Sequence, residues 1–189
     1  METALNFELP EFLARANART LILPNAEDRM RFVLDLARQN VAADGGPFAA
    51  AVFEHESGRL LAAGANRVVA SGYSCAHAEV VALSLAQSRL GHYDLGQADF
   101  PACELVSSAE PCLMCLGAVL WSGITRLTYG AAAADVSSMT VTKIAILPQG
   151  LFIAPPFAQA FIIDLFTSQQ QYSGQIVSRG RPGRECKET

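Results

Sequence analysis

The sequence has little charge and lacks long apolar runs. None of its apolar runs reaches the roughly 18 uninterrupted residues of a membrane-spanning helix. Its start, METALNFELPEFLARANART, has no basic segment followed by an apolar one, so we expect no signal peptide and a cytoplasmic protein. Charged residues make up 17% of the 189 residues and apolar residues 51%, which excludes a disordered chain. This length and composition predict one domain with a substantial core.

The balance of charge argues against a nucleic-acid-binding protein. The net charge is −4, whereas proteins that bind nucleic acids usually present a basic surface. One basic cluster lies near the C-terminus and comprises Arg179, Arg181, Arg184 and Lys187. A solvated chain end explains this cluster better than a phosphate-binding arm does. The five cysteines are odd in number, which does not favour a disulfide framework.

Apolar spacing and helix-breaking residues predict an alternating order of strands and helices. A short helix is expected at 10–18, and a longer one begins at the N-cap candidate Asn25 and ends before 44–47. The predicted elements that follow are strands at 48–54 and 60–64, a helix at about 75–91, a strand at 103–107, a helix at 112–121 and a strand at 125–130. This order implies a mixed sheet with helices on both faces. A further strand is predicted at 141–147, and in the helix at 112–121 we expect four residues to face inward: Leu113, Leu116, Gly117 and Leu120.

Two short motifs, each at the start of a predicted helix, contain the residues best suited to chemistry. They are His77-Ala78-Glu79 and Pro111-Cys112-Leu113-Met114-Cys115. The combination His-x-Glu and Pro-Cys-x-x-Cys is the pattern of zinc-dependent nucleobase deaminases. Zinc with three protein ligands and one open position binds a water and lowers its pKa towards neutrality. The carboxylate of Glu79 then remains free to move protons, which separates a catalytic site from a closed structural one.

Other interpretations of the same residues remain open. A lone Cys-x-x-Cys motif could be redox-active, although a redox role would not explain the preceding His-x-Glu motif. A structural zinc site would need a fourth ligand, for which Cys75 is the nearby candidate; we interpret Cys75 as a small buried thiol. Cys103 and Cys186 receive the same ordinary interpretation. Because Cys112 and Cys115 are three residues apart at a helix N-terminus, both thiolates can face one point and are favoured by the helix dipole.

Around these motifs the chain resembles the cytidine-deaminase-like superfamily, and within it the bacterial guanine deaminases, including an enzyme that also acts on ammeline. The resemblance covers residues 1 to about 130, and the stretches that carry it are GGPFAAAVFE, GANRVV, CAHAEVVALSLA and SAEPCLMCLGAVLWSG. It implies a three-layer α/β/α sandwich with a central mixed sheet of about five strands. It also implies one zinc-dependent deaminase domain over 1–189, with an N-terminal extension at 1–24 and a divergent C-terminal segment at 131–189. A homodimer, in which the C-terminal segment can swap between protomers, is implied as well.

The resemblance also assigns roles to individual residues. It implies that zinc is bound by His77, Cys112 and Cys115, and that Glu79 is the proton shuttle to a zinc-bound hydroxide that converts guanine to xanthine and ammonia. Three further residues correspond to substrate contacts of the family: Asn66, Phe48 and Trp121. Each also has an ordinary explanation, since Asn66 could occupy a left-handed turn after a strand, and Phe48 and Trp121 could belong to the core.

One stretch departs from the family. Bacterial guanine deaminases carry an acid after the fourth strand that takes part in substrate binding and proton transfer. Here the corresponding stretch reads SSMTVTKIAIL, and Lys143 stands about where the acid belongs. Three functions therefore compete: a deaminase of guanine or a related free base such as ammeline, a tRNA adenosine deaminase, and a catalytically weakened, zinc-stabilised dimeric module.

Overall fold

A computed structural model describes residues 7–132 and residue 136 of the chain. The helices within this part are α1 (Glu11–Ala18), α2 (Ala26–Ala42), α3 (Val68–Ser71), α4 (Ala78–Leu90) and α5 (Leu113–Trp121). The strands are β1 (Ala49–Glu54), β2 (Leu60–Ala65), β3 (Cys103–Ala109) and β4 (Arg126–Ala131). In the described part, no helix combines the length and apolar character needed to span a membrane.

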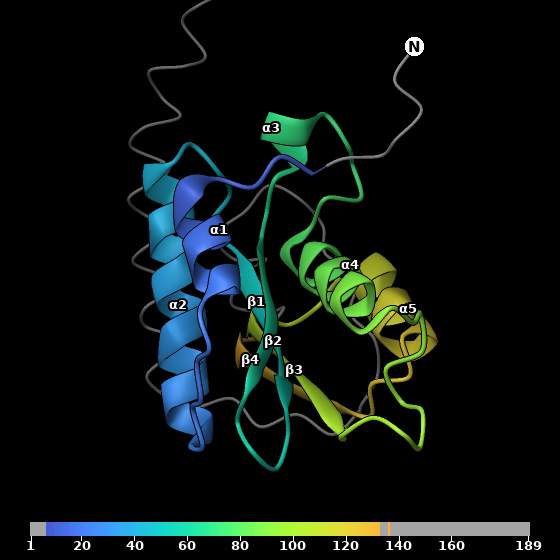
Figure 1. Ribbon diagram of the computed structural model, residues 1–189. Coiled ribbons are helices and arrows are strands. Elements are labelled where there is room, and N and C mark those ends of the chain that lie inside the picture. The colour runs from blue at the N-terminus through green and yellow to red at the C-terminus, as the bar shows by residue number, and fades with distance from the viewer. Residues whose placement is uncertain (1–6, 133–135, 137–189) are drawn as a thin grey trace, which may run out of the picture.

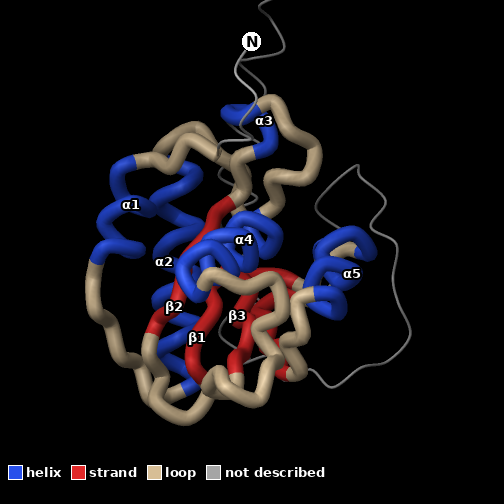
Figure 2. Tube along the Cα trace, turned by 45° about the vertical axis from the view of Figure 1, so that its right-hand side comes forward, coloured by secondary structure: helices blue, strands red, loops and turns tan. Residues whose placement is uncertain are grey.

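The four described strands form one mixed sheet in the order β2-β1-β3-β4. Strand β1 is antiparallel to both of its neighbours, whereas β3 and β4 run parallel. Helices α1 and α2 cover one face of the sheet, and α4 and α5 cover the other (Figures 1 and 2). The predicted α/β/α sandwich is confirmed. The sheet shows four strands where about five were expected, and the strand predicted at 141–147 lies outside the described residues.

The strand directions bring the segments that carry the deaminase motifs to one end of the sheet. At this end β2, β3 and β4 finish and β1 begins, as the pairs Ala49 with Ala65 and Ala109 with Ala131 show. The amide of Arg67, just after β2, donates to the carbonyl oxygen of Ala76, just before α4. Helix α5 begins four residues after β3 ends. The N-termini of α4 and α5 are thereby joined to the same end of the sheet.

Most predicted elements agree with the structure to within a few residues, but two features differ. The short helix α3 lies where a loop was expected. In α5 the expected inward face was wrong: Leu113 is 46% exposed and Leu120 71% exposed, whereas Cys115 and Val119 are buried. Nearly every residue of this helix is apolar, so the sequence has no polar face from which to infer orientation.

Strand β2 lies closest to α4 at Gly64, which makes this glycine a sensitive position. A Cβ there would lie 2.4 Å from the backbone nitrogen of Ala82 and 2.5 Å from the carbonyl oxygen of Ala78. We expect Gly64→Ala to lower the free energy of unfolding by about 1–3 kcal/mol, since the helix backbone must move to accept the methyl group. Chemical denaturation measures the change.

Gly117→Ala is the matched control for this substitution. Among the described residues nothing lies within 4 Å of a Cβ at Gly117, which sits inside α5. Removing a glycine from a helix interior should stabilise the protein by about 0.5–1 kcal/mol. Equal stability of the two variants would contradict a tight contact between β2 and α4.

Candidate metal centre and active site

His77, Cys112 and Cys115 meet between the N-termini of α4 and α5. His77 is the N-cap residue of α4 and Cys112 is the N-cap residue of α5, and both have extended backbone conformations. Each therefore lies one position before the first helical turn in which it was expected. Cys115 lies in the first turn of α5 and is fully buried. The ligand atoms of the three residues all lie within 4.8 Å of one another.

The distances within this group fit a zinc ion. The Nδ1 atom of His77 lies 3.7 Å from the sulfur of Cys112 and 3.5 Å from that of Cys115. Zinc binds nitrogen at about 2.0 Å and sulfur at about 2.3 Å, so neighbouring ligand atoms of a tetrahedral site lie about 3.5–3.8 Å apart. One imidazole and two thiols are also donors that zinc prefers. Three such ligands leave the fourth position open, as in catalytic zinc sites.

Glu79 lies beside this group in the first turn of α4 and is only 7% exposed. Its Oε2 atom accepts a hydrogen bond from the thiol of Cys115 at 3.4 Å, and its Oε1 atom accepts one from the hydroxyl of Ser107 at 3.4 Å. Burial raises the pKa of the Glu79 carboxyl above its ordinary value. A carboxyl group with a raised pKa is suited to general acid–base chemistry.

The two cysteines differ in their electrostatic environment. The pKa of Cys112 is lowered to about 3 by its side-chain hydrogen bonds with Cys115 and His77. The pKa of His77 is raised, chiefly by its hydrogen bond to Cys112. The pKa of Cys115 is raised, because its thiol is held by Cys112 and buried beside Glu79. The group therefore stabilises a thiolate at Cys112, in line with its place at a helix N-terminus.

Phe48 and Asn66 lie together at the same end of the sheet, immediately before β1 and immediately after β2. The amide of Asn66 donates to the carbonyl oxygen of Phe48 at 3.0 Å. Strand β1 connects this pair to the metal-binding group, since Ala50 pairs with Ser107, the residue that contacts Glu79. Phe48 is partly buried and packs against the hydrophobic clusters on both faces of the sheet.

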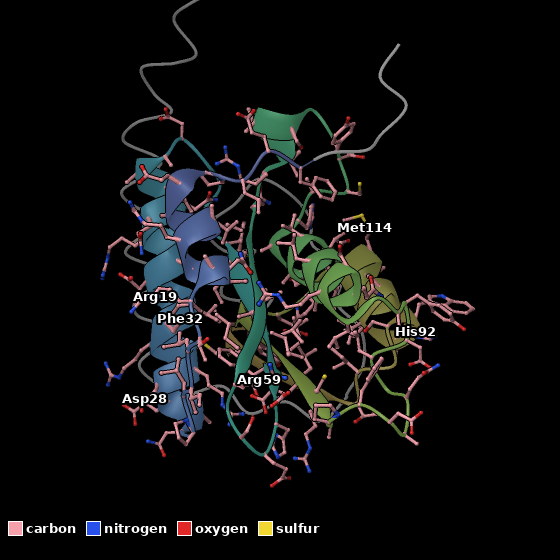
Figure 3. All side chains as sticks on the ribbon, viewed as in Figure 1. Arg19, Asp28, Phe32, Arg59, His92 and Met114 are labelled. Atoms are coloured by element: carbon pink, nitrogen blue, oxygen red, sulfur yellow. The ribbon has the colours of Figure 1, made fainter. Side chains whose placement is uncertain are left out.

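Trp121 lies at the opposite end of α5 from Cys112 and is 85% exposed. It lines a groove of about 300 Å³ between α4 and α5, together with Val80, Leu83 and Tyr93. In Figure 3 the labelled Met114 lies at the end of α5 that carries the ligands. The labelled His92 stacks on Tyr93, which lines the groove, and so lies near the groove. The role of Trp121 as a substrate contact stays a prediction.

Comparison with known proteins identifies the family. A protein-family model, described as the cytidine and deoxycytidylate deaminase zinc-binding region, matches residues 24–131, which is more than half of the chain. The chain belongs to this family. It is a hydrolase that acts on C–N bonds of cyclic amidines, and its cofactor is zinc.

Three relatives are informative within the deaminase family. Guanine deaminase of Bacillus subtilis is 38% identical over 114 residues, which are 60% of this chain and 69% of that protein. A solved structure of guanine deaminase from Nitrosomonas europaea is 44% identical, covers 88% of this chain and 98% of that one, and has a TM-score of 0.81. Another solved structure, 45% identical with a TM-score of 0.83, covers 89% of this chain and 99% of that one and is a complex with 8-azaguanine.

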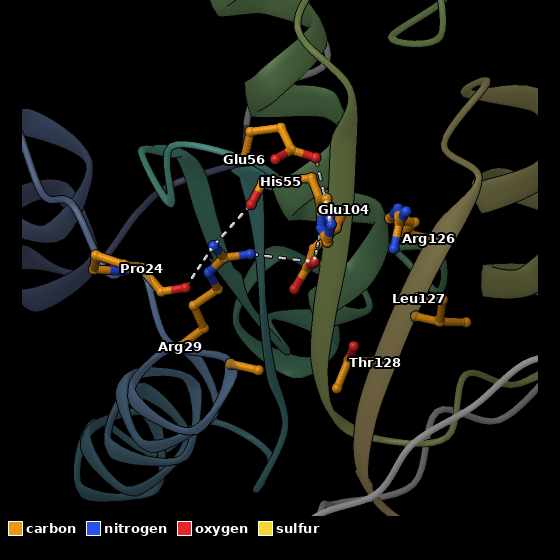
Figure 4. Close-up of a pocket in the computed structure, with 9 residues that line it drawn as sticks. Pro24, Arg29, His55, Glu56, Glu104, Arg126, Leu127 and Thr128 are labelled. Atoms are coloured by element: carbon orange, nitrogen blue, oxygen red, sulfur yellow. Dashed lines mark hydrogen bonds and ion pairs between the residues drawn. The ribbon is translucent and has the colours of Figure 1, made fainter.

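A second polar group, shown in Figure 4, lies where β3 and β4 begin, at the end of the sheet remote from the deaminase motifs. Glu104 accepts contacts from Arg29 at 3.2 Å and from the Nδ1 atom of His55 at 2.7 Å, beside a pocket of about 340 Å³. Arg29 is 3% exposed, and its remaining hydrogen bonds go to the carbonyl oxygens of Leu23, Pro24 and His55. Because Arg29 and Glu104 satisfy one another, we assign the pair a structural role: it joins the start of α2 to the strands.

Sequence reasoning did not find two residues that contact the deaminase site. Ser107 donates to Glu79, and its neighbour Ser108 accepts a hydrogen bond from the amide of Ala49 at 3.1 Å. Asn40, near the end of α2, donates to the carbonyl oxygen of Asn66. Ser107 and Asn40 are ordinary polar residues in sequence terms, and only the pairing of distant segments reveals their contacts.

Proposed function

We propose that the protein deaminates a free nucleobase, with guanine as the substrate and xanthine and ammonia as the products, and with ammeline as an alternative substrate. The observation that carries this proposal is the buried carboxyl of Glu79 beside a three-ligand group that fits zinc. The similarity to two guanine deaminases and to a structure with bound 8-azaguanine supports the choice of an aminated purine.

In this proposal His77, Cys112 and Cys115 hold the zinc, which lowers the pKa of a bound water. Glu79 takes a proton from the attacking water and delivers it to the exocyclic amine, which leaves as ammonia. Ser107 holds one carboxylate oxygen of Glu79, and the other lies beside the sulfur of Cys115, which directs it towards the metal-binding group. One water is consumed and one ammonia released for each base, and no redox change is needed.

Phe48 and Asn66 are the proposed substrate contacts. Phe48 offers an aromatic ring on which a purine can stack, and the amide of Asn66 can donate to and accept from the edge of the base. Two similar solved structures, in which an asparagine is replaced by Gln or by Ala, are complexes with 8-azaguanine. They support the choice of an asparagine as a substrate contact. Trp121 is exposed in the described part of the chain. We propose that it contributes to the substrate pocket in the homodimer proposed below.

The test is ammonia release by the zinc-loaded protein from guanine, ammeline, adenine, cytosine, cytidine and an adenosine-bearing tRNA anticodon stem. Turnover of guanine or ammeline is expected and would show that Lys143, outside the described residues, is compatible with the chemistry. Activity on the tRNA stem alone would establish the tRNA adenosine deaminase instead. The acidic isoelectric point of about 5.3 argues against that outcome. Silence on every substrate with zinc bound would favour the non-catalytic module.

We further propose a homodimer that uses the exposed apolar side of α5. Leu113, Met114, Leu120 and Trp121 are 42–85% exposed on this helix, and an exposed apolar patch commonly marks an interface. Light scattering after size-exclusion chromatography should give twice the chain mass of 20.1 kDa. Leu120→Glu should shift the protein to the monomer, whereas the exposed substitution Glu56→Gln should not. A monomeric wild-type protein would contradict the proposal.

A further inference from the structure

We propose that Asn40 is a positioning residue for substrate binding, because it holds together the two segments that carry Phe48 and Asn66. This inference rests on the proposed function of these two residues. Asn40 itself lies on α2, on the face of the sheet opposite to α4 and α5. It is fully buried and is not one of the metal-binding residues.

The side chain of Asn40 bridges two loops. Its Nδ2 atom donates to the carbonyl oxygen of Gly46 at 2.8 Å and to that of Asn66 at 2.9 Å. Its Oδ1 atom accepts from the Nη1 atom of Arg67 at 3.1 Å. One amide group thus satisfies its hydrogen bonds across the loop before β1 and the loop after β2. A buried amide bonded in this way holds both loops in one arrangement.

The two loops are joined directly to the proposed substrate contacts. The amide of Phe48 donates to the carbonyl oxygen of Gly46 at 2.8 Å, and the amide of Asn66 donates to that of Phe48 at 3.0 Å. Asn40 therefore closes a ring of hydrogen bonds that runs through Gly46, Phe48 and Asn66. Movement of Asn40 would displace the aromatic ring and the amide relative to one another.

The glycines of this loop fit the same arrangement. A Cβ at Gly45 would lie 2.3 Å from the Nδ2 atom of Asn40, and a Cβ at Gly46 would lie 3.1 Å from the side chain of Asn66. Gly45 thus makes room for the bridging residue, and Gly46 makes room for the proposed substrate contact. The Gly-Gly pair before Phe48 is explained by these two close approaches.

The experiment compares steady-state kinetics of the zinc-loaded wild type, Asn40→Ala and Asn40→Asp with guanine. Asp has the volume of Asn and keeps an acceptor for Arg67, but it cannot donate to either carbonyl oxygen, so it breaks the bridge without opening a cavity. We expect KM to rise about tenfold in both variants, the equivalent of one net hydrogen bond, with kcat within about twofold. Zinc content should stay unchanged. The Kd of 8-azaguanine, measured by calorimetry, should rise in parallel.

Asn17→Ala is the matched control. Asn17 has the same bonding pattern, since its Nδ2 atom donates to the carbonyl oxygens of Leu13 and Ala63 and its Oδ1 atom accepts from the amide of Ala63. It ties α1 to the middle of β2, away from Phe48 and Asn66. We expect it to lower the melting temperature as Asn40→Ala does, but to leave KM and the Kd of 8-azaguanine at wild-type values.

The outcomes separate the positioning role of Asn40 from the proposed function on guanine. Unchanged KM and Kd in both Asn40 variants, or an equal change in the Asn17 control, would overturn the positioning role and leave Asn40 with a purely structural one. If the wild type acts on another base of the panel, the same comparison with that base tests Asn40 while the choice of guanine fails. If no base is turned over, the Kd values of 8-azaguanine for the wild type, the two Asn40 variants and the Asn17 control still decide the role of Asn40.

Discussion

Glu79→Gln should leave zinc bound and lower the rate of ammonia release by a factor of about 10²–10⁴, the usual contribution of general acid–base catalysis. The substitution keeps the size of the side chain, and the amide oxygen can still accept from Ser107 while the amide nitrogen faces the sulfur of Cys115, but an amide cannot take up and return a proton. Turnover number and zinc content per chain, measured on the same preparation, test the prediction.

Glu56→Gln is the control for this substitution, because the Glu56 side chain is 90% exposed and lies at the other end of the sheet. It should match the wild type in rate, zinc content and melting temperature. If Glu79→Gln retained the wild-type rate, Glu79 would not be the proton shuttle. A wild type that is active and a Glu79→Gln variant that is stable, zinc-bound and inactive would together exclude the non-catalytic module.

Cys115→Ser should reduce both zinc content and turnover to near zero. Cys115 is fully buried between Cys112, His77 and Glu79, so a hydroxyl there offers a poorer zinc ligand with no solvent to compensate. Because zinc stabilises only the folded state, the melting temperature should also fall and should no longer respond to a chelator. Metal analysis and thermal unfolding with and without chelator measure the two effects.

Two other cysteines provide controls for this prediction. Cys103 lies in β3 with its pKa raised to about 11 by burial, so it remains a thiol at neutral pH, and its Sγ atom donates to the carbonyl oxygen of Pro101. Cys103→Ser should keep zinc bound. Cys75→Ser should do the same. Loss of zinc in Cys75→Ser would instead make Cys75 a fourth ligand and the site a closed structural one.

The short-range parts of the candidate site could be predicted from the sequence because they depend on local spacing. Cys112 and Cys115 are three residues apart at the start of a helix, so both sulfurs can face one point, and Glu79 follows His77 by two residues at the start of another helix. The roles of these residues remain predictions. Trp121 could not be placed in this way, because the periodicity of an entirely apolar α5 does not define a face.

By itself, the sequence determined which residues can bind zinc, where most of the helices and strands lie in residues 7–132, and that the sheet is mixed. These properties follow from residue chemistry and from periodicities of a few residues. Only the tertiary structure decided that His77 meets Cys112, 35 residues later, that Ser107 contacts Glu79, and that Asn40 bridges the loops of Phe48 and Asn66. Such contacts depend on strand order and register, which bring distant segments to one end of the sheet.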